Sequence, residues 1–328
     1  MDATAAQIGF INAFENHFES VLNDPRHAQA EPRILMEASR HLAFADGAKR
    51  MRPMLVNHFG DMVALPLEQR IRLAIATELI HTASLLHDDV VDDGSERRGR
   101  PTANARWHNS VAVLSGDLVL CIALEQLEDL PHKITIEAID LVAEMTRAAM
   151  LEVRARRNHQ WTLSDWTAVA RGKTGALLAW CGAAPALATG QPELARRLHR
   201  CGHHLGIAFQ LADDLVDLTG IEAGKDPLND LRQANPSYIV GLAREMDPDL
   251  RRRIDAAWQA PTTPDDELLR ELAQEIKDLG CPQATVTAIE EHVADAHQAL
   301  GDLENSSTSL IVEWTTQLLT LARRCLEH

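Results

Sequence analysis

The chain has 328 residues, which allows a sizeable buried core, and no Ser-, Gly- or Pro-rich linker divides it, so we expect one domain over residues 1–328. Its formal net charge of −16 argues against a nucleic-acid partner and against docking on anionic lipid. The five cysteines lack metal-ligand spacing and predict reduced thiols in a cytoplasmic protein. The sequence shows neither a signal-peptide pattern nor an apolar stretch long enough to be a transmembrane segment.

Apolar residues recur at i, i+3, i+4 and i+7 along most of the chain, and strand signals are nearly absent, which predicts an all-α protein. Helices are expected over residues 4–23, 30–45, 51–63, 67–92, 104–129, 133–158, 163–189, 191–219, 236–246, 248–259, 264–279, 284–302 and 307–326. Polar loops are expected at 93–101 and 220–227. The C-terminal helices of 262–328 carry little recognisable chemistry and are interpreted as scaffold or subunit interface.

The first chemical signal along the chain is basic, in the heptapeptide Gly47-Ala-Lys-Arg-Met-Arg-Pro53. Lys49, Arg50 and Arg52 come just before a predicted helix, whose first backbone N–H groups favour anions, and guanidinium groups match phosphate oxygens. A solvated basic turn is the alternative interpretation of this stretch by itself.

An acidic cluster follows at the end of the helix expected over 67–92. Asp88, Asp89 and Asp92 fall at i, i+1 and i+4, within one sector of a helix surface, and Arg97 and Arg98 come shortly afterwards. Three carboxylates that close repel one another unless cations lie between them. A single cluster of this kind is also typical of a solvated acidic helix end.

The same spacing recurs at Asp213, Asp214 and Asp217, on the helix expected over 191–219. Two such clusters on separate helices could face each other across a cavity in a helix bundle and hold several Mg2+ ions. Because Mg2+ takes few protein ligands, water and substrate phosphate would complete its shell. The repeated spacing therefore favours a metal site for a diphosphate.

Together these motifs resemble the all-trans polyprenyl (isoprenyl) diphosphate synthases, which condense isopentenyl diphosphate onto an allylic diphosphate. The resemblance is strongest over 30–240. The other motifs that carry it are Glu78-Leu-Ile-His-Thr82, Leu114-Ser-Gly-Asp117, Arg171-Gly-Lys-Thr174 and Gly206-Ile-Ala-Phe-Gln-Leu-Ala-Asp-Asp214. The resemblance implies an isoprenoid-synthase-type helical bundle around a deep central pocket, a homodimer, and a Mg2+ cofactor with three ions per active site.

The resemblance also implies a role for each matching residue. Mg2+ would be bound by Asp88, Asp89, Asp92, Asp213 and Asp217. The allylic diphosphate would contact Arg97, Lys173 and Lys225, with Thr174 and Gln210 nearby. Isopentenyl diphosphate would be held by Lys49, Arg52, His81 and Arg98. Lys173 is expected to act in catalysis as well, by stabilising the leaving diphosphate.

The expected chemistry follows from the charges. Breaking the allylic C–O bond separates a carbocation from a diphosphate, and metal ions with lysines stabilise the leaving group. The isopentenyl double bond then attacks the cation, and no side-chain nucleophile is required. Water has to be excluded from the cation, so an apolar pocket below the metal site is part of the expected mechanism.

Product length is expected to depend on the depth of that pocket. Ala83 and Ser84 lie one turn before Asp88, where short-chain members of the family often place an aromatic residue. Small side chains there leave a tunnel open and favour a medium- to long-chain product of more than fifteen carbons. The alternative is that Ala83 and Ser84 only pack a helix crossing.

Two departures from the family pattern concern diphosphate binding. Ala155 stands where a glutamine is expected, although Glu152 is present, and Asn235 stands where a lysine is expected. Three other functions stay open: a short-chain (geranylgeranyl or farnesyl) diphosphate synthase, a class I terpene cyclase, and a noncatalytic regulatory synthase subunit, which the two departures keep open. Both intact aspartate clusters argue against the last.

Overall fold

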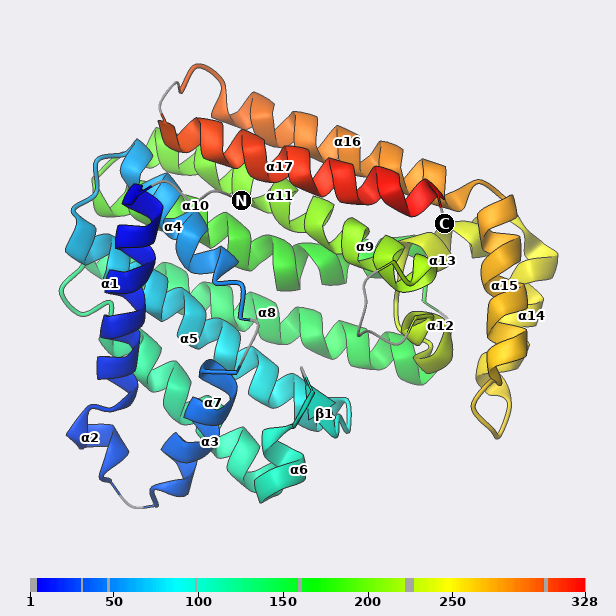
Figure 1. Cartoon of the computed structure of the whole chain (residues 1–328), viewed down its shortest axis with the longest axis horizontal. Coiled ribbons are helices and arrows are strands. Elements are labelled where there is room, and N and C mark those ends of the chain that lie inside the picture. Colours follow the sequence, from blue (N-terminus) through cyan, green and yellow to red (C-terminus); the bar gives the residue numbers. More distant parts are fainter. Residues whose placement is uncertain are drawn as a thin grey trace. The chain divides into compact units, whose positions relative to one another are not determined.

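The computed structural model describes residues 5–30, 32–45, 48–97, 99–158, 161–221, 227–303 and 306–327. Within these ranges the chain is almost wholly helical, which confirms the predicted all-α class (Figure 1). The chain forms two compact units, the first from Met1–Val142 with Trp180–Arg196 and the second from Ala143–Ala179 with Arg197–His328. Helices α8, α10 and α11 contribute residues to both units. That the chain acts as one domain stays a prediction.

The first unit is built around helix α5, whose side chains are buried along most of its length. Helices α1, α3, α4 and α7 all contact α5. The elements that lie wholly in this unit are α1 (Ala5–Leu22), α2 (Pro25–Ala28), α3 (Ile34–Ala43), α4 (Met51–Met62), α5 (Leu67–Val91), β1 (Glu96–Arg97), β2 (Arg100–Pro101), α6 (Ala103–Trp107) and α7 (Asn109–Glu125).

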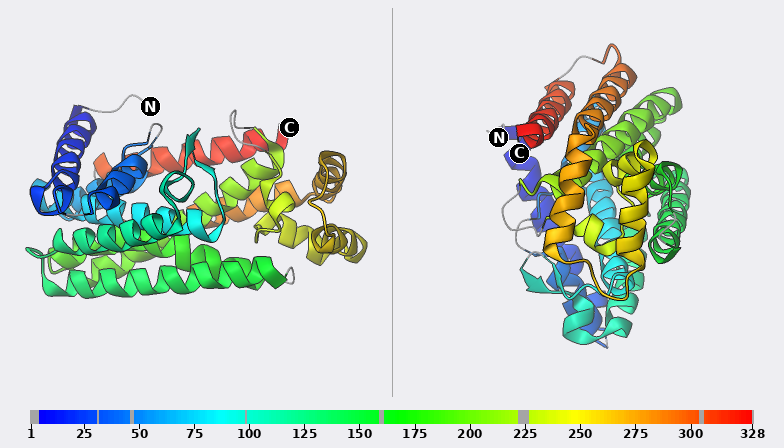
Figure 2. Two further views of the ribbon diagram at one scale, coloured as in Figure 1. Left: turned by 90° about the horizontal axis from the view of Figure 1, so that it is seen from below. Right: turned by 90° about the vertical axis from the view of Figure 1, so that its right-hand side faces the viewer.

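The second unit has an apolar core that includes Trp166, Leu215, Ile239, Trp258 and Ile289. Helices α16 and α17 pack side by side, and α13 contacts α14, α15 and α16 (Figures 1 and 2). Its elements are α9 (Leu163–Ala170), a π-helical turn (Arg171–Gly175), α12 (Asn229–Gln233), α13 (Tyr238–Met246), α14 (Pro248–Gln259), α15 (Asp266–Asp278), α16 (Cys281–Leu300), α17 (Ser306–Arg324) and a 3-10 turn (Cys325–Glu327). The helices shared with the first unit are α8 (His132–Asn158), α10 (Ala176–Ala188) and α11 (Pro192–Thr219).

Most predicted helix boundaries are confirmed to within a few residues, but the sequence pattern missed several local features. The helix expected over 104–129 is interrupted at His108, whose φ of 84° no α-helix accommodates. The loop expected at 93–101 contains the antiparallel pair β1–β2, in which Arg97 lies opposite Arg100. The helices α2 and α12 were not predicted, because an apolar period cannot be recognised in elements of four or five residues.

The cysteines agree with the expectation of reduced thiols. All five are free, and all but Cys121 are buried. In the described part of the chain, no helix combines the length and the apolar character that crossing a membrane requires.

Candidate active site

The first aspartate cluster lies at the C-terminal end of α5, where the helix dipole is already negative. Asp88 is in the last turn, Asp92 is the C-cap residue, and the last turn of α5 contains no basic residue. Asp89 is buried, Asp88 is half-buried and Asp92 is exposed. Carboxylates at this end of a helix are each unfavourable by about 0.3–1 kcal/mol, so the cluster favours cation binding.

Arg97 offsets part of this negative charge. Its Nε and Nη2 atoms lie 2.9 and 2.8 Å from Oδ1 of Asp89. The second carboxylate oxygen, Oδ2, is buried and has no hydrogen-bond partner among the described residues. A buried carboxylate oxygen without a donor is costly, and a metal ion would satisfy it. The arrangement therefore fits a cation at Asp89, and it places the predicted diphosphate ligand Arg97 beside that carboxylate.

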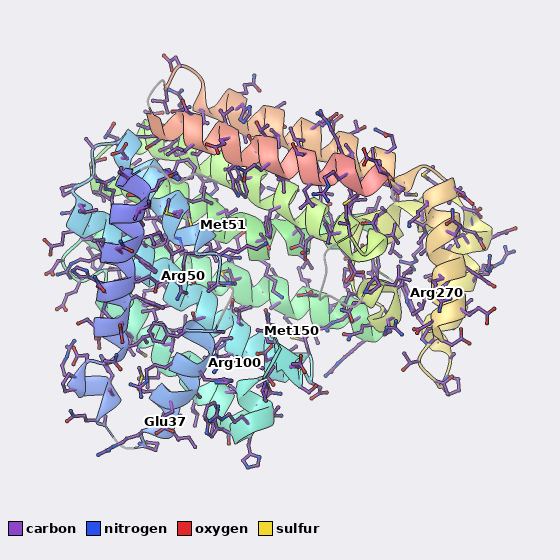
Figure 3. The ribbon with its side chains drawn as sticks, in the orientation of Figure 1. Glu37, Arg50, Met51, Arg100, Met150 and Arg270 are labelled. Atoms are coloured by element: carbon purple, nitrogen blue, oxygen red, sulfur yellow. The ribbon has the colours of Figure 1, made fainter. Side chains whose placement is uncertain are left out.

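In the basic heptapeptide, Arg50 has a structural role, and the cations Lys49 and Arg52 lie on either side of it in the sequence. Arg50, labelled in Figure 3 just before α4, adopts a left-handed φ of 46°. Its guanidinium donates to Glu15 Oε1 and Glu78 Oε1 at 2.7 Å each, and it packs over the ring of Phe18. Arg50 thus ties the start of α4 to α1 and α5.

The residues predicted to hold isopentenyl diphosphate lie around this anchor. Lys49 is exposed and Arg52 is half-buried in the first turn of α4. His81 is half-buried on α5, one turn after Glu78, the partner of Arg50. Arg50 was one of the three candidate cations of the heptapeptide, but its guanidinium is used in ion pairs with Glu15 and Glu78. The family resemblance assigns isopentenyl diphosphate to Lys49 and Arg52, and that assignment stays a prediction. The fourth residue of this predicted set, Arg98, lies outside the described residues.

Small side chains precede the cluster on α5, as the sequence indicates. Ala83 is buried. The Ser84 hydroxyl donates to the carbonyl oxygen of His81 at 2.8 Å, so its hydrogen bond is made within the helix. His87 faces α7, where its Nε2 lies 3.1 Å from the carbonyl oxygen of Val113. His87 therefore packs between helices. Ala83 and Ser84 are small residues one turn before Asp88, and their effect on product length stays a prediction.

The second aspartate cluster lines a pocket of about 490 Å³ in the second unit. Among the described residues, the ionisable groups that line the pocket are five carboxyl groups and one ammonium group, a formal excess of four negative charges if all are ionised. They belong to Glu152, Asp213, Asp214, Asp217, Asp230 and Lys173. As in α5, the aspartates of α11 are near its C-terminal end, and the last turn has no basic residue. This pocket therefore attracts cations.

Asp214 is the buried member of the cluster. Its Oδ2 accepts from Trp166 Nε1 at 2.8 Å and from the Tyr238 backbone N–H at 2.7 Å, and its Oδ1 accepts from Gln210 at 3.1 Å. Burial nevertheless raises the pKa of the Asp214 carboxyl to about 7, and the neighbouring Asp213 carboxylate adds to the increase. With its acceptors already used, Asp214 positions the pocket wall, whereas the exposed Asp213 faces the solvent.

We expect Asp214→Asn to change the pH dependence of stability in the metal-free protein. A carboxyl whose folded pKa is raised stabilises the fold at low pH and loses that contribution as pH rises toward the folded pKa. The wild-type protein should therefore lose up to about 4 kcal/mol from this group between pH 4 and pH 7. Urea unfolding with a chelator, at several pH values, measures the slope. Equal slopes for both proteins would contradict the raised pKa.

Asp217 also caps the N-terminus of the short helix α12. Its two carboxylate oxygens accept the backbone N–H groups of Asn229 and Asp230 at 3.1 and 3.0 Å, at the N-terminus of α12. Leu228, just before this helix, has a left-handed φ of 62°. That conformation costs a non-glycine residue roughly 1–2 kcal/mol. Burial of the Leu228 side chain stabilises the fold by about 1.5–3 kcal/mol and offsets this cost. Asp217 and Leu228 together hold α12 against the pocket.

Asp230, on α12, adds a carboxylate that the sequence analysis did not identify as a site residue. Burial and the Asp214 and Asp217 carboxylates raise its pKa well above the usual value. Asn235, which replaces the lysine expected from the family, donates to Asp230 Oδ1 at 3.2 Å. Ala155, at the other departure, is buried in the apolar core. At Asn235 a neutral amide therefore stands where the family resemblance implies a cation.

Lys173 and Thr174 lie on the π-helical turn between α9 and α10, a local irregularity that often occurs at functional sites. Lys173 Nζ pairs with Glu152 Oε2 at 2.7 Å, and Thr174 Oγ1 lies 3.2 Å from Gln210 Oε1. The turn touches α11 at Gly206, where a Cβ atom would lie 2.9 Å from the Thr174 carbonyl oxygen. Backbone contact thus fixes the turn against the pocket.

Within the second unit, the structure brings together most of the residues that the sequence predicted for it. They are Lys173, Thr174, Gln210, Asp213 and Asp217. Lys225 lies outside the described residues. Trp166 belongs to the apolar core, and it also lines the pocket and donates to Asp214. No motif of the sequence indicated this second role, although a buried indole N–H needs a hydrogen-bond partner. That the two aspartate clusters face each other stays a prediction.

Comparison with known proteins gives consistent matches. Residues 32–276 match the family model described as "Polyprenyl synthetase". Heptaprenyl diphosphate synthase component 2 of Geobacillus stearothermophilus is 38% identical over 222 residues, which are 66% of this chain and 68% of that protein. The structure of a decaprenyl diphosphate synthase from Rhodobacter capsulatus aligns with a TM-score of 0.87 at 29% identity, over 97% of this chain and 98% of that one. A polyprenyl synthase from Caulobacter crescentus, complexed with calcium and isoprenyl diphosphate, aligns with a TM-score of 0.82 at 25% identity, over 98% and 96%.

Proposed function

Because the chain belongs to the polyprenyl synthetase family and is a prenyltransferase, we propose that it condenses isopentenyl diphosphate with an allylic diphosphate to give a medium- to long-chain polyprenyl diphosphate. The observation that carries this proposal is the acidic pocket of the second unit, whose described lining residues include five carboxyl groups and one lysine. An excess of carboxyl groups repels an anionic substrate, so we infer that cations bind together with it. A magnesium diphosphate satisfies that requirement.

We propose that the metal is Mg2+, three ions per active site, because hard carboxylate oxygens and few protein ligands suit this ion. The proposed ligands are Asp88, Asp89, Asp92, Asp213 and Asp217. The buried Oδ2 of Asp89 and the exposed carboxylate of Asp213 fit this role, and the Caulobacter crescentus relative was crystallised with calcium. When bound, the ions would neutralise the diphosphate as it leaves the allylic carbon.

The side chains around these ligands bind and orient the substrates. Arg97 is held by Asp89 and can turn to a diphosphate once cations neutralise that carboxylate. Lys173, held by Glu152 in the same way, can donate to the diphosphate oxygens where charge accumulates. Thr174 and Gln210 position the π-helical turn that carries Lys173. Lys225 and Arg98 are proposed to contact the two diphosphates.

The second substrate, isopentenyl diphosphate, is proposed to bind Lys49, Arg52 and His81. The anchor formed by Arg50 with Glu78 supports this assignment, because it fixes the first turn of α4 near the turn of α5 that carries His81. No side-chain nucleophile is needed, since the double bond of the substrate supplies the electrons. The released diphosphate would accept the final proton.

We expect Ala83→Phe to shorten the product, because an aromatic ring one turn before Asp88 would close the tunnel that small side chains leave open. Since Ala83 is buried, Ser84→Phe at the half-buried neighbouring position provides a second test. Leu85→Phe is the matched control, for it adds a ring about 100° further around α5. Chromatography of dephosphorylated products gives the chain lengths. An unchanged length in both tunnel variants would show that the tunnel floor lies elsewhere.

A homodimer, which the family resemblance implies, is part of the proposal. Exposed apolar side chains on α7, Val113 and Leu114, and on α8, Ile136 and Ile139, support a second copy as the partner. The name of the Geobacillus stearothermophilus relative, "component 2", suggests a heteromer as the alternative. Light scattering of the purified chain separates monomer from dimer.

A cytoplasmic location likewise remains a prediction.

The experiment that tests the proposal is incubation of the purified chain with Mg2+, labelled isopentenyl diphosphate and each allylic primer in turn. A ladder of polyprenols ending at a defined length is the expected result. A single short product would favour the short-chain alternative, and hydrocarbon products would point to a cyclase. Binding of substrate without any product would contradict the proposal for the chain alone and favour a component that needs a partner.

A further inference from the structure

A cluster of metal-ligating side chains lies in the second unit, separate from the carboxylate pocket. His204 comes from α11, and His292 and Asp295 come from one face of α16, where they are spaced i and i+3. The ligating atoms of these three residues all lie within 4.8 Å of one another. None of the three belongs to the lining of the pocket that contains Asp213.

The distances within the cluster suit a metal ion. His204 Nδ1 lies 2.9 Å from His292 Nδ1 and 3.6 Å from Asp295 Oδ2. Two imidazole nitrogens bound to one tetrahedral Zn2+ at about 2.0–2.1 Å would be about 3.3 Å apart, so a shift of a few tenths of an ångström accommodates the ion. Without metal, the two nitrogens can share only one proton between them. A divalent cation gives each nitrogen a bond, and the Asp295 carboxylate partly balances its charge.

We propose that His204, His292 and Asp295 bind a Zn2+ ion that ties α16 to α11. Imidazole ligands select transition metals over Mg2+, which separates this site from the aspartate clusters. The side chain of His204 is 26% exposed and that of Asp295 is 53% exposed, so the ion can enter from solvent and a water molecule can take the fourth position. Because α11 also carries Gln210 and Asp213, the ion would secure the helix that positions the acidic pocket.

The test measures Zn2+ bound by the full-length protein, purified without a histidine tag and dialysed in a large excess of Mg2+. Magnesium occupies the hard carboxylate sites under these conditions. We expect one tightly bound Zn2+ per chain, and visible ligand-field absorption when Co2+ replaces it. His204→Ala and His292→Ala should each weaken binding by at least about 100-fold, since even residues that only orient a metal ligand contribute 10- to 100-fold.

His297→Gln is the matched control, because His297 lies on the same helix and bonds Thr315 instead of the cluster. Circular dichroism shows whether each variant retains its helices. The proposal would be overturned if the wild-type protein binds no more Zn2+ than His292→Ala, or if both histidine variants bind it as tightly as the wild type. Asp213→Asn, which should lack prenyl transfer, should keep the Zn2+ site, so failure of the proposed activity and failure of this inference are distinguishable.

Discussion

Replacing one carboxylate in either aspartate cluster, by Asp88→Asn or Asp213→Asn, should lower kcat by about 1,000-fold while the protein stays folded. The amide keeps the size of the side chain and removes the negative charge with which the proposed ligand would attract Mg2+. Both residues lie toward helix C-termini among other carboxylates, so the metal-free variants should unfold at equal or higher temperature than the wild type. Steady-state turnover and thermal unfolding with a chelator measure the two effects.

Asp93→Asn is the matched control for Asp88→Asn. Asp93 is exposed next to the first cluster and has a left-handed φ of 50°, a conformation that asparagine tolerates well. The Asp93→Asn substitution removes the same charge outside the proposed ligand set. The turnover of this variant should stay within about threefold of the wild type. Near-normal turnover of Asp88→Asn or Asp213→Asn, or equal losses in all three variants, would refute the metal assignment.

The second large effect is expected for stability, from Gly202→Ala. Gly202 on α11 faces α10, and an added Cβ atom would lie 2.1 Å from the Leu178 carbonyl oxygen and 2.9 Å from the Ala179 Cα. These are backbone atoms of a packed helix, so they cannot move aside as a flexible side chain can. Overpacking typically costs about 1–3 kcal/mol, and a clash with backbone atoms should lie at the upper end of this range. Urea unfolding should show the loss as a lower midpoint.

Gly9→Ala is the control, since it makes the same change in a helix with open space around it. An added Cβ at Gly9, in α1, meets no atom within 4 Å. Alanine there should leave stability unchanged or raise it by about 0.5–1 kcal/mol, because alanine favours the helix. If Gly202→Ala unfolds at the same urea concentration as the wild type, the close approach of α10 and α11 is wrong.

The helices and the aspartate clusters could be predicted because their signals are local. An apolar period of 3.6 residues marks α11, and a long apolar segment without Gly or Pro marks α5. The spacing of Asp213 and Asp217 is visible without any tertiary contact. The family, the fold class and the prenyltransferase activity that followed from these motifs are confirmed. The individual ligand assignments stay predictions.

Other features depend on contacts between residues far apart in sequence, and the sequence does not reveal them. Trp166 joins the pocket only because its indole reaches Asp214 on another helix. The short helix α12 forms where Asp217 caps it from twelve residues away, and Asp230 becomes a pocket carboxylate for the same reason. The π-helical turn at Lys173 has no compositional signature, because its backbone is fixed by contact with Gly206.

The placement of both aspartate clusters near helix C-termini has a consequence for engineering. Each cluster gathers like charges where α5 and α11 already have a negative end, so the metal-free protein retains repulsion that the proposed cations would relieve. A selection for heat resistance that is run with a chelator would therefore enrich variants that have lost these carboxylates. The same selection run with Mg2+ and a diphosphate would retain them, because ligand binding would then add to the stability of the folded state.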